Sequence, residues 1–400
     1  MLCLHSRTIM RYLKWGLIGF VALLAITVAW AYPYEKAIEN PGIFNKEDFS
    51  RYDILLSDSV IRELDELRKE GLEKMDFSDV KIRKKAKVII DGDTLEAFVK
   101  LKGDLPDHYD SDQYSLRVMY TDRDSAIRVV SLQHPKTRRY ISELIFHKLL
   151  KQEDMLFLNY DFVTVYINGN YKGFYAAEEH FSNHNIEEKW GLPHGAILGF
   201  RDDFYWPQGM LPWDQEFDTK TYKAAEIKCF NCNNEDQSDL YQTAIDKLYN
   251  YQNGKLKAHE VFDLDQMAKY YAICDLTGAS HALRWLNCRY YYNTEKQRFQ
   301  PAGFDSNGHR INRIALKNFR MNTAHHGRIF ADPNFKTAYK NYLKHYSDLD
   351  FIDEFFEKNY QEFNKYNSAF IHTNEFNCSP NMKFFHYNRF VIIAALVFSI

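Results

Sequence analysis

The chain has 400 residues, with 51 Lys and Arg against 54 Asp and Glu, and a formal net charge of −3. Because 46% of the residues are hydrophobic, a chain that is disordered throughout is excluded, and the length allows two or three domains. The near-neutral charge argues against a nucleic-acid-binding protein, in which a clustered basic face would be expected.

The N-terminal stretch 1–34 predicts a cytoplasmic stub followed by a membrane anchor. An uncharged apolar run, 15–32, follows the basic residues Arg7, Arg11 and Lys14. Such a run reaches the length of a transmembrane helix, and its basic flank is expected to stay in the cytoplasm. Ala29-Trp30-Ala31 also fits a signal-peptide cleavage site, which is the alternative. Either way, we expect the main domain to be extracytoplasmic, in a periplasm or at a cell surface.

Residues 35–82 are predicted to form a polar linker and one helix, 59–70, with Ser57 or Asp58 as its N-cap and Gly71 at its end. Residues 83–180 are predicted to form a sheet lobe. Its expected elements are strands at 84–90, 94–101, 114–120 and 126–132, and a helix at 138–151 that begins after Thr137.

The sheet lobe ends in the most distinctive local pattern of the chain, a hairpin with strands at 162–167 and 172–177. Asn168-Gly169 lies at the bend, and this pair favours the positive φ values of a tight hairpin turn. Two acidic residues, Glu178 and Glu179, follow the second strand. They either line a cleft or lie on a solvated strand end.

Residues 181–376 are predicted to form a helical lobe, with helices at 186–190, 239–251 and 263–277. Cys229 and Cys232 in a long loop allow a local disulfide, whereas a zinc site would need further ligands. A small hairpin, 288–292 with 298–304, leads into Asp305. The tail, 377–400, ends in a short apolar run that fits a final strand, a membrane-dipping segment or the start of a longer apolar segment. The element order predicts an α+β, kinase-like fold with two lobes, an antiparallel sheet lobe and a helical lobe, behind a transmembrane helix.

Four motifs occur in order between about Phe98 and Asn307, and with them the chain resembles the CotH-like kinases, atypical kinases named for spore coat protein H. The motifs are Lys102-Gly103-Asp104 with Tyr114–Arg117, Leu132–Arg138 with Glu143, Val165–Gly169 through Gly173–Tyr175 to Glu178–Phe181, and Asn287–Tyr291 leading to Gly303-Phe304-Asp305.

The resemblance implies transfer of the ATP γ-phosphate to a hydroxyl of a protein or envelope component, with Mg²⁺. Asn287 and Asp305 would supply hard oxygen ligands to Mg²⁺. Lys102 or Arg117 would hold the phosphates, with Glu143 orienting that cation. Glu178 and Glu179 would lie beside the adenine and ribose. The alternatives are an ordinary turn at Asp305 and solvated surface charges elsewhere.

One departure from the kinase pattern leaves catalysis open. Ala282 stands five residues before Asn287, where a kinase has its catalytic Asp. The neighbouring His281 is either a substitute base or a structural His at a helix end. The phosphate loop is also reduced, to the single-glycine turn Asp91–Asp93. The alternative function is therefore a membrane-anchored, non-catalytic binding or assembly protein of the cell envelope.

Overall fold

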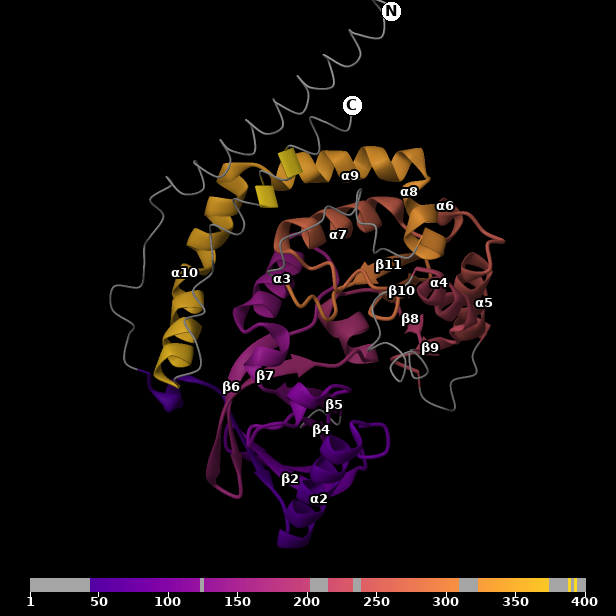
Figure 1. Ribbon diagram of the computed structural model, residues 1–400. Coiled ribbons are helices and arrows are strands. Elements are labelled where there is room, and N and C mark those ends of the chain that lie inside the picture. The colour runs from indigo at the N-terminus through magenta and orange to yellow at the C-terminus, as the bar shows by residue number, and fades with distance from the viewer. Residues whose placement is uncertain are drawn as a thin grey trace, which may run out of the picture.

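The structure is a computed structural model. It describes residues 44–122, 126–201, 215–232, 239–308 and 323–373, together with 388–389 and 392–393. Figure 1 shows strands β2 (Lys84–Ile90), β4 (Leu116–Thr121) and β5 (Ile127–Gln133) at one end of the molecule and helices α7 (Leu264–Thr277), α8 (Arg328–Phe330) and α9 (Pro333–Tyr346) at the other. Helix α3 lies between these two ends.

Seven strands close into a barrel in the order β1-β2-β3-β4-β5-β7-β6. Neighbouring strands pair antiparallel except β1 and β6, which pair parallel with Ile54 opposite Ile167. Helix α2 packs against β3. The elements are β1 (Arg51–Leu55), α2 (Asp58–Lys74), β2 (Lys84–Ile90), β3 (Asp93–Leu101), β4 (Leu116–Thr121), β5 (Ile127–Gln133), β6 (Tyr160–Ile167) and β7 (Asn170–Glu179).

The predicted fold class is wrong in its sheet lobe, because the observed sheet is closed and contains a parallel pair. Strand β1 causes the difference, and it lies in the segment predicted to be a linker. It pairs with β2 on one side and β6 on the other, so the edges that an open sheet would expose are satisfied. Ile54 points into the barrel core and is fully buried.

The predicted transmembrane helix is not part of the described fold. Among the residues that the structure describes, no helix is both long and apolar enough to cross a bilayer. The run 15–32 lies outside the described residues, and so does most of the 377–400 tail.

Several local predictions are confirmed. Asn168 and Gly169 have φ values of 50° and 76° at the turn between β6 and β7. Ser57 caps α2 by accepting a hydrogen bond from the Val60 amide, although the helix continues past Gly71 to Lys74. The disulfide Cys229–Cys232 is formed.

The start of α3 differs from the prediction. Thr137 belongs to a 3-10 turn, η3 (Pro135–Arg138), and its hydroxyl donates to the His134 carbonyl. Arg139 and Tyr140 then adopt positive φ, so α3 (Ile141–Gln152) begins only at Ile141. This sharp turn directs α3 toward the second half of the molecule, where it packs against α7.

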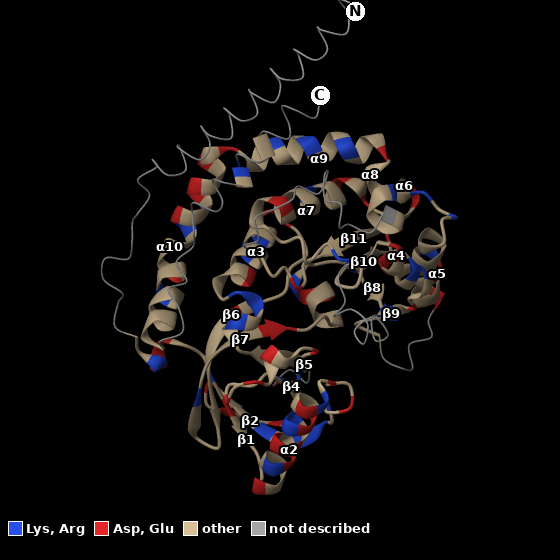
Figure 2. Cartoon of the chain, viewed as in Figure 1, with Lys and Arg blue, Asp and Glu red and all other residues tan. Residues whose placement is uncertain are grey.

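The second half consists of helices around a four-stranded sheet of order β11-β10-β8-β9. Its elements are η4 (Asn185–Lys189), β8 (Ile197–Phe200), α4 (Gln215–Ala224), β9 (Ile227–Cys229), α5 (Asp239–Gln252), α6 (Ala258–Val261), α7 (Leu264–Thr277), β10 (Arg289–Asn293), β11 (Arg298–Ala302), η6 (Thr323–Gly327), α8 (Arg328–Phe330), α9 (Pro333–Tyr346) and α10 (Leu349–His372). Charges of both signs are interspersed along α2 and α10 (Figure 2), as on solvated helix faces, whereas the charged residues of α9 are all lysines.

Candidate nucleotide pocket

A central pocket of about 490 Å³ is lined by β3, β4 and β7 of the barrel and by residues around β9, β10 and β11. This volume is in the range of small-molecule and cofactor sites. All of the predicted site residues except Glu143 line it, namely Lys102, Arg117, Glu178, Glu179, His281, Asn287 and Asp305. The fold thus brings together residues that lie up to 203 positions apart in the sequence (305 − 102).

Asp305 lies just after β11, is almost fully buried and has a left-handed backbone with φ of 50°. Its Oδ1 lies 3.3 Å from Arg138 Nε and 3.3 Å from His281 Nδ1. Burial alone would raise the pKa of Asp305, but Arg138 and His281 hold it well below its usual value. Asp305 is therefore an ionised carboxylate, and its Oδ1 has no hydrogen-bond partner in the described structure.

Asn287 and Asp305 are linked by His281, which contacts both of them. The Asn287 amide nitrogen lies 3.0 Å from both the carbonyl oxygen and the ring Nδ1 of His281. His281 Nδ1 in turn lies 3.1 Å from the Asp305 carbonyl oxygen. One histidine thus contacts both residues that the sequence predicts as magnesium ligands. Ala282, at the usual base position, is buried and offers no acid–base group.

Glu143 has a different set of partners from the one predicted. Its buried carboxylate accepts hydrogen bonds from the Ser306 amide (3.0 Å), the Ser306 hydroxyl (2.6 Å) and the Asn307 amide (3.1 Å). Burial would raise its pKa, but the bond to His147 and the charge of Arg138 lower it. Glu143 therefore fixes the strained loop after β11, in which Asn307 also has positive φ, rather than orienting Lys102.

Lys102 is paired instead with Glu178. Its Nζ lies 2.6 Å from Gln133 Oε1 and 3.9 Å from Glu178 Oε2, and Gln133 also donates to Glu178. Burial, followed by the nearby charge of Arg138, lowers the pKa of Lys102 to about 7. The second candidate cation, Arg117, lies on the neighbouring strand β4 and donates to the Ser131 hydroxyl at 3.4 Å.

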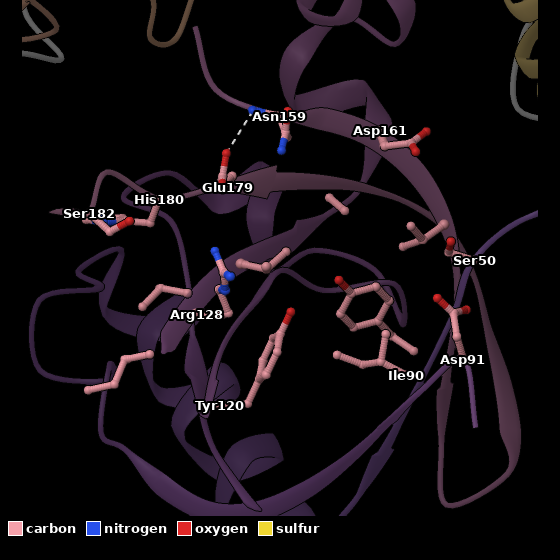
Figure 3. A pocket seen from close by; sticks show the side chains of 16 residues that line it. Ser50, Ile90, Asp91, Tyr120, Arg128, Asn159, Asp161, Glu179, His180 and Ser182 are labelled. Carbon is pink, nitrogen blue, oxygen red and sulfur yellow. Dashed lines mark hydrogen bonds between the residues drawn. The ribbon is translucent and has the colours of Figure 1, made fainter. Parts of the chain in front are cut away.

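Glu178 and Glu179 point to opposite faces of β7, as successive strand residues do. Glu178 is buried beside Lys102, and its Oε1 lacks a hydrogen-bond partner in the described structure. Glu179 accepts from the Asn159 amide at 3.0 Å, as Figure 3 shows, and from Lys189 Nζ at 2.7 Å. Glu179 lines a second pocket of about 310 Å³ as well as the central one.

Two arginines of the central pocket were not assigned a role from the sequence. Arg138 is buried against Asp305 at the end of η3. Arg138 is the last residue of the Leu132–Arg138 motif, and its place in that motif is the sequence feature that could have indicated a role in the site. Arg289, at the start of β10, lies 4.0 Å from the Phe230 ring centre and 4.5 Å from that of Phe304. Stacking between two rings fixes its position at the pocket wall.

The residues of the central pocket fit a magnesium–nucleotide complex. Asp305 Oδ1 and Glu178 Oε1 are buried carboxylate oxygens without hydrogen-bond partners among the described residues, and Mg²⁺ prefers such hard oxygens. Lys102, Arg117 and Arg138 supply positive charge to the same pocket for phosphate groups. The arrangement is thus a charged cofactor-type pocket between a barrel and a second, mostly helical half.

Comparison with known proteins then gives the family. The family model described as CotH kinase protein matches residues 100–377, which is more than half of the chain. The protein therefore belongs to the CotH kinase family, and the resemblance read from the four motifs is confirmed. A comparison with curated proteins found no match.

Proposed function

We propose that this protein binds Mg²⁺–ATP in the central pocket and acts as an atypical kinase toward a hydroxyl of a protein or cell-envelope component. Membership of the CotH kinase family supports the reaction class. The single observation that carries the site assignment is the meeting of Asn287 and Asp305 at His281, in one pocket with Lys102.

The roles follow from what each group offers to phosphoryl transfer. Asp305 and the Asn287 amide oxygen would hold the metal, which neutralises charge on the transferred phosphoryl group when bound. Lys102, held near Glu178, would contact phosphate oxygens, with Arg117 beside it. Glu143 would act indirectly, by fixing the loop that carries Asp305. His281 is the nearest acid–base group to the usual base position.

A second candidate is a nucleotide-binding protein without efficient transfer. The buried Ala282 at the usual base position favours it. Both candidates need the same pocket, and they differ only in whether His281 accepts the proton of the acceptor hydroxyl. The disulfide Cys229–Cys232 supports the extracytoplasmic location for either candidate, because disulfides persist in oxidising compartments.

Nucleotide binding is tested by the melting temperature of the full chain with and without Mg²⁺–ATP. A ligand that binds only the native state must raise that temperature, and 100-fold saturation over Kd corresponds to about 2.7 kcal/mol. Asp305→Asn should abolish the shift, whereas Asp246→Asn, on the exposed face of α5, should keep it. An unchanged melting temperature at millimolar Mg²⁺–ATP would remove both candidates.

Catalysis is tested separately by transfer of the γ-phosphate to protein in a cell-envelope extract. If the chain is a kinase with His281 as base, His281→Gln should lower the rate of transfer by a larger factor than it lowers nucleotide affinity, because His281 also contacts Asn287 and Asp305. If the shift occurs without transfer, the second candidate stands.

A further inference from the structure

Three potential metal ligands that do not line the oxygen-rich pocket lie together in the second half of the molecule. Cys288 precedes β10, and His325 and His326 lie in η6. One ligand atom from each of the three lies within 4.8 Å of the others. All three residues are buried, with exposed fractions of 5%, 0% and 1%.

Two of the three residues have a potential ligand atom with capacity for a further bond. His326 Nε2 is buried and has no hydrogen-bond partner among the described residues. Cys288 is not in a disulfide, and its Sγ makes a long contact of 3.9 Å with the Ala282 carbonyl oxygen and interacts with the Tyr290 side chain. A buried imidazole nitrogen without a partner is costly in an apolar environment, because water has been removed from it and nothing replaces it.

Tyrosine hydroxyls hold the imidazole rings in place. Tyr271 contacts His326 Nδ1, and the ring also interacts with the backbone of Leu283. Tyr222 contacts His325 Nδ1 at 3.0 Å and Tyr290 contacts His325 Nε2 at 2.6 Å. Metal-binding histidines are commonly oriented in this way by a partner on the second nitrogen.

We propose that Cys288, His325 and His326 form a binding site for a thiophilic transition-metal ion, and that this ion is Zn²⁺. One thiolate and two imidazoles are a ligand set of zinc sites, whereas Mg²⁺ selects oxygen ligands. Because the three ligand atoms lie no more than 4.8 Å apart, an ion between them would lie at most about 2.8 Å from each, against about 2.0–2.3 Å in zinc sites, so a small contraction at most completes the geometry. Binding replaces the thiol proton of Cys288, and His325 exchanges its bond to Tyr290 for the metal.

The site would join two segments that are distant in sequence. Cys288 directly follows Asn287, and η6 leads into α8. An ion there would clamp η6 to the start of β10 and would stabilise the wall of the central pocket without taking part in it. The proposal does not depend on the proposed kinase function.

The test is titration of the metal-depleted full chain with Co²⁺, a spectroscopic substitute for Zn²⁺, in excess Mg²⁺. We expect one equivalent to produce thiolate-to-cobalt charge-transfer absorption, which Zn²⁺ then removes. Cys288→Ser should abolish this absorption, and His326→Gln should weaken binding more than about tenfold, since losing even an outer partner of a ligand costs about 10–100-fold.

Two variants serve as controls. Cys274→Ser changes the other buried cysteine that is outside a disulfide among the described residues, and Asp305→Asn changes the oxygen-rich pocket. Both should keep the absorption. If the unmodified chain shows no thiolate-to-cobalt absorption, or if Cys288→Ser still shows it, the proposal is overturned. If the ligand variants fail to fold, the unmodified chain provides the test. Stoichiometric Zn²⁺ should raise its melting temperature, and an unchanged melting temperature would also overturn the proposal.

Discussion

Arg138 and Asp305 form a buried ion pair across the central pocket, with 3.3 Å between Nε and Oδ1 and side-chain exposures of only 10% and 12%. The pair connects η3, which follows β5 of the barrel, with the loop after β11. Neither atom makes a hydrogen bond in the described structure, so charge alone holds them together. The ion pair therefore couples the barrel side of the central pocket to the side formed by the loop after β11.

Removing one partner of this pair should be costly. Arg138→Met leaves the Asp305 carboxylate buried without its main cation, and we expect a loss of about 3–5 kcal/mol in the free energy of unfolding. Denaturation by urea measures it. The double variant Arg138→Met, Asp305→Asn should recover part of the loss, because the uncompensated charge is gone. Additive losses would show that the pair has no coupling.

Glu143 should contribute stability that depends on pH. Its pKa in the folded protein lies below the unfolded value of about 4.3, so the ionised form stabilises the fold above that pH and the effect is lost as the pH falls through the folded pKa. At pH 7 we expect Glu143→Gln to lower the free energy of unfolding by about 1.5–3 kcal/mol.

The difference between the unmodified chain and Glu143→Gln should therefore shrink below about pH 4. Unfolding by urea at pH 7 and at pH 4 and below measures it. Glu70→Gln, on the exposed side of α2, should change stability by less than about 0.5 kcal/mol at either pH. A difference that grows on acidification would contradict this assignment.

Nucleotide affinity should depend on pH through Lys102. Because its pKa is lowered to about 7, the free protein loses this charge as the pH rises from 6 to 8, while phosphate binding favours the charged form. We expect the Kd for Mg²⁺–ATP to weaken roughly tenfold over this range, measured by calorimetry. Lys102→Met should bind more weakly and lose this part of the pH dependence. An equal slope in both proteins would show that Lys102 does not meet the phosphates.

Gly103, next to Lys102, should not tolerate a side chain. It has φ of 122°, and an added Cβ would lie 2.2 Å from His108 Cγ. We expect Gly103→Ala to destabilise the protein by more than the about 1–2 kcal/mol that left-handed strain alone costs. Gly92→Ala is the matched control, since Gly92 has φ of 94° and an added Cβ would have no atom within 4 Å. Thermal unfolding compares them, and equal losses would exclude a clash with His108.

The sequence alone determined many of the local elements and the family. Alternation of apolar residues and the turn at Asn168-Gly169 depend on neighbours in the chain, so the hairpin of β6 and β7 and the cap at Ser57 were predictable. The ordered motifs identified the CotH kinase family because each includes residues close together in sequence.

Only the tertiary structure decided the pairings over long distances. Strand β1 closes the barrel because its two edges pair with β2 and β6. The sequence of a five-residue segment does not indicate which distant strands it will pair with. The same holds for the partners of charged residues in the pocket. Glu143 accepts a hydrogen bond from the Ser306 amide because the direction of α3 brings the two groups together. Lys102 pairs with Glu178 because their side chains lie on the same side of the sheet. Residue type specifies what a side chain can bind, whereas packing specifies which partner it meets.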